Sequence, residues 1–226
     1  MTWTPPPLLD ARDPDRIRGA LYGSQLFDQP EHANDRDAIL SFLQTGEVQS
    51  PVALEIGFDH GMVILDHARR FPHIRWLGLE IRKKRVEAAA RHAPDNCRLV
   101  RADARTVLAA LIPRNTLDFI YILFPTPTED PRHLLLTPQT VEHLRRALKP
   151  NGQLHLATDV EGLFYWAEQL FTDWLPGTGL PFGPVLSRRD RVCRRDGLSV
   201  WRATWRCPQE AGDASTPTSP HTAEQG

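Results

Sequence analysis

The residues that could bind a ligand lie just after an apolar, strand-like segment. That segment ends in Glu55-Ile56-Gly57, and Asp59 and Gly61 follow before an amphipathic stretch begins at Met62. A strand that stops at a glycine turn and re-enters a helix leaves free backbone N–H groups at the helix N-terminus, which attract an anion. The acid two places before the first glycine suits an ammonium. This stretch therefore predicts a site for a small zwitterionic ligand.

The glycine spacing argues against a nicotinamide dinucleotide as this ligand. A dinucleotide fingerprint needs three glycines, so that the backbone can approach the pyrophosphate. Counted from Gly57, its middle and last glycine positions hold Asp59 and Met62. A dehydrogenase is therefore the least favoured of the functions considered.

The composition is that of one globular domain with short extensions. The chain has 226 residues, of which 41% are hydrophobic and 24% charged, and its formal net charge is −1. No apolar run is long enough to span a bilayer, and the N-terminus lacks the charged start and apolar segment of a signal peptide. The three cysteines lie far apart without metal-ligand spacing. We expect reduced thiols, no metal site and a cytoplasmic protein without membrane contact, and the sequence leaves a monomer and a homodimer open.

Apolar strand-like segments alternate with amphipathic helical segments between residues 51 and 207. The predicted strands are Val52–Ile56, Arg75–Glu80, Cys97–Arg101, Leu117–Phe124 and Gln153–Thr158. The predicted helices are Met62–Phe71, Lys84–Ala93, 104–111, Pro138–Leu148 and Glu161–Trp174. The pattern then changes, because Pro184–Ser187 and Ser199–Arg206 are typical of an antiparallel pair around a basic loop. This order predicts an α/β domain over residues 51–207, with a doubly wound, mostly parallel sheet and an antiparallel C-terminal end.

The segments on either side of this domain are predicted to differ from it. Residues 1–50 are predicted to form an N-terminal arm that packs across the domain, with a short helix at Ala38–Leu43 capped by Asn34 or Asp35. Residues 208–226 are rich in Pro, Thr, Ser, Glu and Gly. They bury little apolar surface and therefore predict a disordered tail.

Further acids follow the second and third strands. In a sheet of this kind the ligand lies outside the carboxyl ends of the strands, so we expect these acids to meet Glu55 at one edge. Glu80 ends the second strand, where a carboxylate can accept both hydroxyls of a ribose. Asp103 and Ala104 follow the third, where they can hold an adenine rim through a carboxylate and a backbone amide. An amino-acid end, a ribose and an adenine together predict S-adenosylmethionine (SAM).

The motifs at these strand ends resemble those of the bacterial tRNA (guanine-N7-)-methyltransferase family over about residues 50–207. The matching motifs, in chain order, are Leu54-Glu55-Ile56-Gly57-Phe58, Gly78-Leu79-Glu80-Ile81, Asp103-Ala104, Phe124-Pro125-x-Pro127, Arg132-His133, Thr158-Asp159 and Ser187-Arg188-Arg189-Asp190. The resemblance implies a Rossmann-like SAM-dependent methyltransferase fold, SAM as cofactor, and methylation of guanine N7 in the variable loop of tRNA.

The resemblance also implies roles for individual residues. The cofactor would contact Glu55, Gly57, Asp59, Gly61, Glu80, Asp103 and Ala104. The substrate would meet Thr126 and Asp159 at the reacting centre, and Arg132, Asp159, Ser187 and Asp190 around it. The chain departs from the family at Asp59, where members have a glycine, and at Thr126 and Thr128, where they have an aspartate and a tryptophan. The basic run that follows in the family is replaced by an acidic and then apolar segment.

The expected chemistry is mainly positioning. Guanine N7 carries an in-plane lone pair and no proton, so attack on the SAM methyl group needs no general base. Thr126 can accept a hydrogen bond from the guanine edge but lacks a charge, and charged hydrogen bonds are about twice as strong. Asp159 or Asp190 could hold that edge instead. The basic segments Arg82–Arg85, Arg132-His133 and Arg188–Arg195 are candidates for phosphate contacts.

Two alternatives stay open at the level of sequence. A divergent methyltransferase of another nucleic acid or a small molecule is favoured by the altered loop Thr126–Leu136. A SAM-binding paralogue without catalytic activity is favoured by the missing aspartate at Thr126.

Overall fold

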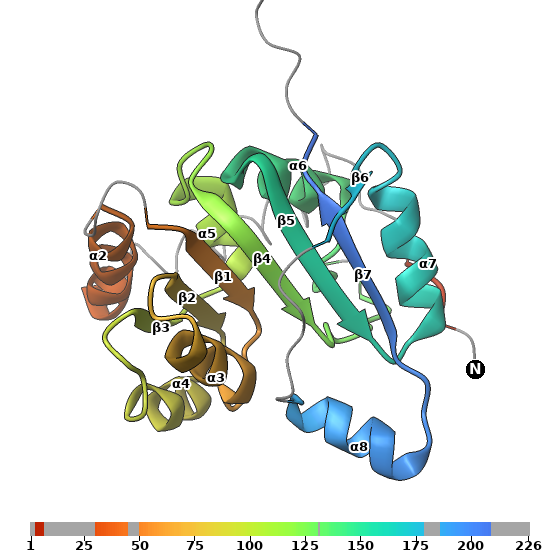
Figure 1. Cartoon of the computed structure of the whole chain (residues 1–226), viewed down its shortest axis with the longest axis horizontal. Coiled ribbons are helices and arrows are strands. Elements are labelled where there is room, and N and C mark those ends of the chain that lie inside the picture. The colour runs from red at the N-terminus through yellow and green to blue at the C-terminus, as the bar shows by residue number, and fades with distance from the viewer. Residues whose placement is uncertain (1–2, 7–29, 45–49, 131, 179–185, 209–226) are drawn as a thin grey trace, which may run out of the picture.

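The computed structural model describes residues 3–6, 30–44, 50–130, 132–178 and 186–208. These residues build one sheet of seven strands in the order β3-β2-β1-β4-β5-β7-β6 (Figure 1). The parallel strands are β1 (Val52–Ile56), β2 (Arg75–Glu80), β3 (Cys97–Arg101), β4 (Leu117–Leu123) and β5 (Leu148–Thr158). The strand β7 (Trp201–Arg206) runs antiparallel between β5 and β6 (Leu175–Pro176). The predicted α/β class, with a mostly parallel sheet and an antiparallel end, is confirmed.

Helices cover both faces of the sheet, which explains why the central strands are apolar on both sides. The helices are α2 (Pro30–Gln44), α3 (Met62–Arg70), α4 (Lys83–Ala90), α5 (Ala104–Ala110), α6 (Pro138–Ala147), α7 (Glu161–Leu170) and α8 (Arg188–Asp196). One core layer joins Leu54 and Ile120 of the sheet to α5 and α6, and the other joins Trp76 and Tyr121 to α3. The parallel strands lie between these two layers of helices, and their carboxyl ends meet at one edge of the sheet, where the candidate site lies.

The N-terminal helix is longer than predicted. Because α2 begins at Pro30, Asn34 and Asp35 lie within the helix and do not cap it. Ile39 of α2 is fully buried in the core. Most of the predicted arm, residues 1–50, and nearly all of the predicted tail, 208–226, lie outside the described residues.

Three further elements differ from the sequence prediction by more than two residues at one end, and one of them is α4, which ends at Ala90 instead of Ala93. The strand β5 begins at Leu148 and includes the predicted turn 149–152, where Asn151 adopts a positive φ of 65°. The helix α7 ends at Leu170 instead of Trp174. Pairing along β4 and β7 extends β5, and a single-strand pattern does not contain that information.

The basic segment near the C-terminus is a helix, so the predicted basic loop is wrong. Ser187 and Asp190 form a reciprocal capping box at the start of α8, and Gly197 ends it with a positive φ of 65°. The antiparallel partners of β7 are β5 and β6, whereas Ser187 belongs to the helix cap. Residues 184 and 185 of the predicted strand lie outside the described residues. Five arginines in nine residues hide the short apolar side of α8, which consists of Val192 and the buried Cys193.

Within the part of the chain that the structure describes, no helix has the length and apolar character needed to cross a membrane.

Candidate active site

A cavity of about 760 Å³ opens at the carboxyl ends of the parallel strands. Residues that follow β1 to β5 line it, together with the first residues of α8. Nine residues predicted from the sequence lie in its wall: Glu55, Gly57, Asp59, Glu80, Asp103, Ala104, Thr126, Asp159 and Ser187. Three others that were predicted, Gly61, Arg132 and Asp190, are not part of the wall. The cavity has the volume of a typical small-molecule site.

The turn after β1 has a left-handed backbone at Gly57 (φ 72°), Asp59 (φ 52°) and Gly61 (φ 75°). A Cβ on Gly57 would meet no atom within 4 Å, so Gly57 leaves the backbone accessible from the cavity. A Cβ on Gly61 would lie 3.0 Å from the Cβ of Ala89. Gly61 therefore allows α3 to pack closely on α4 and shapes the turn from behind the wall.

Glu55 is a buried acid of the cavity wall, with only 3% of its surface exposed. Burial raises the pKa of its carboxyl to about 8. A hydrogen bond from the backbone N–H of Ile64 lowers this pKa in part, and the nearby charge of Asp59 raises it slightly. Its Oε2 atom has no hydrogen-bond partner among the described residues. An unpartnered buried carboxyl is costly, and a cationic ligand group would relieve that cost.

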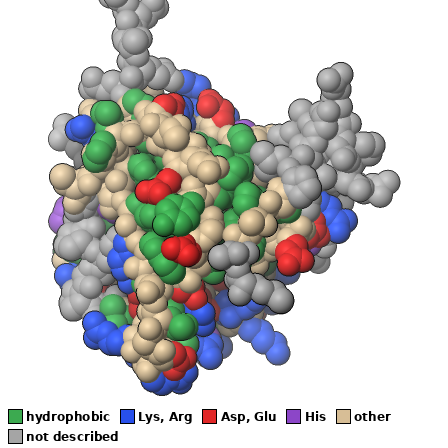
Figure 2. Space-filling view, turned by 90° about the vertical axis from the view of Figure 1, so that its right-hand side faces the viewer, with side chains coloured by type: hydrophobic (Ala, Val, Ile, Leu, Met, Phe, Trp, Pro, Cys, Tyr) green, Lys and Arg blue, Asp and Glu red, His purple; other side chains and the backbone are tan. Residues whose placement is uncertain are grey.

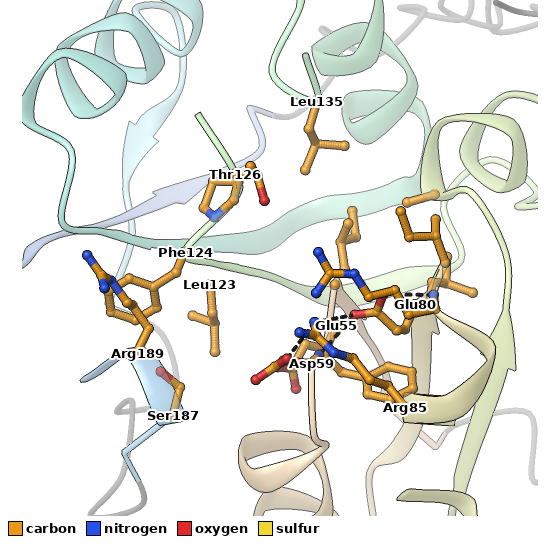
Figure 3. A pocket seen from close by; sticks show the side chains of 18 of the residues that line it. Glu55, Asp59, Glu80, Arg85, Leu123, Phe124, Thr126, Leu135, Ser187 and Arg189 are labelled. Carbon is orange, nitrogen blue, oxygen red and sulfur yellow. Dashed lines mark hydrogen bonds and ion pairs between the residues drawn. The ribbon is translucent and has the colours of Figure 1, made fainter. Parts of the chain in front are cut away.

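Glu80 is held mainly by backbone. Its two oxygens accept hydrogen bonds from the N–H of Asp59 at 3.2 Å and the N–H of Arg82 at 3.0 Å. Arg85 of α4 reaches back over the turn, 2.5 Å from Asp59 Oδ1 and 3.7 Å from Glu80 Oε2. Figure 3 shows these three side chains gathered beside Glu55 on one side of the pocket. One guanidinium thus balances two carboxylates.

Asp103 caps α5 by accepting from the backbone N–H of Arg105 at 2.9 Å. Its carboxylate also pairs with the guanidinium of Arg105, with 2.6 Å between Nη2 and Oδ2. The same hydrogen bond raises the pKa of Arg105. Asp103 is therefore already partnered where it meets the cavity, and Ala104 follows it as the first residue of α5.

The opposite side of the pocket begins with the loop after β4. Phe124 has a positive φ of 53°, which is strained for a bulky residue, and its N–H donates to the carbonyl of Ala157 at 2.7 Å. Thr126 is exposed, and its hydroxyl makes no hydrogen bond to the described residues in the structure. In Figure 3 Phe124, Thr126, Ser187 and Arg189 lie together, away from the Glu55 group.

The first turn of α8 connects the two sides. Arg189 donates to Asp159 at the end of β5, and Arg188 hydrogen-bonds to His60 after β1 with 3.2 Å between Nη1 and Nε2. Sequence reasoning assigns no individual role to Arg85, Phe124 or Arg189. Their partners come from other elements, and residue spacing along the chain does not reveal such contacts.

Asp190 and Arg132, both predicted to contact the substrate, lie outside the cavity wall and have ion-pair partners within the chain. Asp190 is 7% exposed, accepts from the N–H of Ser187 at 3.0 Å and forms an ion pair with Arg202 of β7. It anchors α8 to the sheet, behind the wall. Arg132 is half exposed and pairs with Asp130 at 2.8 Å.

Comparison with known proteins gives a consistent result. A family model described as "Putative methyltransferase" matches residues 49–174. A tRNA (guanine-N(7)-)-methyltransferase from Colwellia psychrerythraea is 30% identical over 72% of this chain and 68% of its own. One from Saccharophagus degradans is 31% identical over 81% of this chain and 82% of its own. Several other relatives with the same name match over about half of their own length.

Among solved structures, a mutant of the 16S rRNA (adenine(1408)-N(1))-methyltransferase from Catenulisporales acidiphilia, with the cosubstrate SAM, has a TM-score of 0.52 at 14% identity. It covers 81% of this chain and 94% of that protein. At this identity the likeness shows a shared fold.

Proposed function

The chain belongs to the tRNA (guanine-N(7)-)-methyltransferase family, and we propose that it transfers a methyl group from SAM to N7 of a guanine in tRNA. The observation that carries the cofactor assignment is Glu55, a buried acid of the cavity wall with one oxygen left without a partner in the described structure. An isolated buried carboxyl is rarely retained without a cation to meet it. The ammonium of SAM is such a cation.

The wall residues fit the remaining parts of SAM. Glu55 would accept from the ammonium, and the open turn at Gly57 would present backbone N–H groups to the carboxylate. Glu80, fixed by two backbone N–H groups, would accept from the ribose hydroxyls. The start of α5 at Asp103 and Ala104 would border the adenine. When bound, SAM supplies a methyl group made electrophilic by the sulfonium.

The other side of the pocket would orient the guanine. Guanine N7 has a free lone pair in the ring plane, so the residues need to align it with the methyl group and exclude water. Asp159 can accept from guanine N1–H and from the exocyclic amine with a charged carboxylate, and Thr126 can accept only as a neutral group. Phe124 adds an apolar surface next to Thr126. We therefore assign the main recognition of the guanine edge to Asp159.

Phosphate contacts would come from cations on both sides of the mouth. Arg82 and Lys84 near α4, and Arg191 and Arg194 on α8, form no ion pair with described residues in the structure. Figure 2 shows Lys and Arg side chains gathered at the lower end of the molecule, where α8 lies in Figure 1. Each phosphate neutralised by such a side chain releases counterions, which makes binding salt-dependent. The tRNA partner and a cytoplasmic location are part of the same proposal.

Transfer of label from SAM to bulk tRNA that lacks N7-methylguanosine tests the function. The tRNA is digested to nucleosides after the reaction and the labelled nucleoside is identified. Label in N7-methylguanosine is the expected result. Binding of SAM by calorimetry without label in any RNA would contradict the proposal and favour a non-catalytic SAM-binding protein.

A further inference from the structure

Asp159, the proposed acceptor for guanine, is already occupied by a side chain of this chain. The Nε–H of Arg189 donates to Asp159 Oδ2 at 3.0 Å, and its Nη2–H donates to the same oxygen. The hydrogen bond to Asp159 raises the pKa of Arg189. Both residues line the cavity, with the Asp159 side chain 13% exposed and that of Arg189 46% exposed.

The two donors of Arg189 match the donors of guanine. A guanidinium presents adjacent N–H groups in one plane, and these fit a carboxylate. Guanine presents N1–H and an amine N–H side by side in the plane of its ring, along the edge opposite to the reacting N7. If Oδ2 of Asp159 accepts from the N–H groups of guanine, it has to release the N–H groups of Arg189. Asp159 Oδ1 receives no hydrogen bond from the described residues.

We propose that Arg189 is a specificity-determining residue that holds the place of guanine at Asp159 and leaves it only when a phosphate of the RNA accepts the guanidinium. This inference rests on the proposed function. When guanine arrives as part of an RNA, Arg189 exchanges Asp159 for a phosphate of that RNA. Free guanosine brings no phosphate, so it has to displace Arg189 without compensation. The site then favours guanine in RNA over the free nucleoside.

The anchoring of α8 allows this exchange. Asp190 and Ser187 cap the helix, and Asp190 is tied to Arg202 of β7. Arg189 can therefore change partner without unwinding the helix that carries it. Its half-exposed guanidinium is screened by water, so the ion pair with Asp159 is modest in strength.

The test compares Arg189→Ala with wild-type protein and with Arg195→Ala. Arg195 lies on the same helix outside the cavity wall and pairs with Asp196, so its replacement removes an equal charge without touching Asp159. Two quantities are measured: the inhibition constant of guanosine as a competitor of tRNA methylation, and the KM for tRNA at several salt concentrations. Inosine, which lacks the exocyclic amine, serves as the control ligand.

The expected result is a pair of opposite shifts in Arg189→Ala. Guanosine should inhibit at about fivefold lower concentration, since an exposed ion pair no longer competes. The KM for tRNA should rise, and its logarithmic salt slope should fall by about one. Inosine should gain less than guanosine, and Arg195→Ala should leave guanosine inhibition unchanged.

A guanosine inhibition constant that is unchanged or higher in Arg189→Ala, while the wild-type protein methylates tRNA normally, would overturn the inference. It would leave the proposed function intact. Absence of methyl transfer to tRNA guanine by the wild-type protein would instead contradict the proposed function itself. A general loss of structure would weaken inhibition by both nucleosides equally, which separates it from the opposite shifts expected here.

Discussion

The two sides of the cavity are built in different ways. The half of the cavity that we propose for the cofactor, formed by Glu55, Gly57, Glu80 and Asp103, comes from three consecutive strand-to-helix turns between residues 55 and 104. Backbone N–H groups hold the carboxylate of Glu80 there, and burial surrounds Glu55. The proposed substrate half, formed by Phe124, Thr126, Asp159, Ser187 and Arg189, comes from three separated segments, of which the last two are joined by the ion pair between Asp159 and Arg189. Backbone contacts fix a ligand geometry in advance, whereas an ion pair between side chains can exchange partners.

Replacing Glu80 with Gln should produce the largest change in the cofactor half. The amide NH2 would face the N–H of either Asp59 or Arg82 while the amide oxygen accepts from the other, and the charged bonds to the ribose would be lost. Two charge-assisted hydrogen bonds correspond to a loss in SAM affinity on the order of 100-fold, measured by calorimetry. The matched control is Glu87→Gln on α4, whose carboxylate is 54% exposed and 3.9 Å from Lys83. Equal effects in both variants would contradict a special role for Glu80.

The second largest effect should be the change in the free energy of unfolding with pH that the raised pKa of Glu55 causes. Its folded pKa of about 8 lies above the unfolded value of 4.5, so the folded state keeps the proton that the unfolded state loses. Stability is therefore lost as pH rises between these values. Buried His155, whose pKa is lowered from 6.5 to about 4, acts in the opposite direction below pH 6.5. The clean window is thus pH 6.5 to 8.

In that window the free energy of unfolding of the wild-type protein should fall by about 2 kcal/mol, at roughly 1.4 kcal/mol per pH unit. The Glu55→Gln variant should lack this decrease. Denaturant unfolding at several pH values provides the measurement. Parallel curves for the two proteins would contradict the raised pKa of Glu55 in the folded state.

Asp59, like Asp103, has a side-chain partner in this half of the cavity, in its case Arg85 of α4. Asp59→Gly removes a negative charge near the expected SAM carboxylate, and glycine adopts the φ of 52° without strain. SAM affinity should rise about threefold, a small change because Arg85 already balances the charge. Asp59→Asn, which keeps a side chain that tolerates this backbone, should give a similar gain. A gain in the glycine variant alone would assign the effect to the backbone and not to the charge.

The same difference between the halves explains what the sequence could predict. Glu55, Glu80 and Asp103 each lie at or just after the end of a strand that its apolar pattern predicts. Parallel strands end at one edge of the sheet, so the sequence predicts that these three acids meet there. The sequence predicts a loop over the basic segment 188–195, because its arginines obscure the short apolar side of α8, although the Ser187-x-x-Asp190 spacing of a capping box is a signal of a helix start. Asp190 was predicted to bind substrate, but its ion pair with Arg202 depends on how β7 pairs with β5. Contacts that depend on how distant strands pair cannot be predicted from the spacing of residues along the chain.

The most direct test of the division between halves is Asp159→Asn, measured for SAM affinity and for methyl transfer to tRNA in the same preparation. The variant retains the shape of Asp159 and removes the charge that would hold the guanine edge. We expect a SAM Kd within about twofold of wild type and a loss of methyl transfer of roughly 100-fold, the cost of a charged contact in the pocket. A parallel loss of SAM affinity, or methyl transfer at the wild-type rate, would contradict the assignment of Asp159 to guanine.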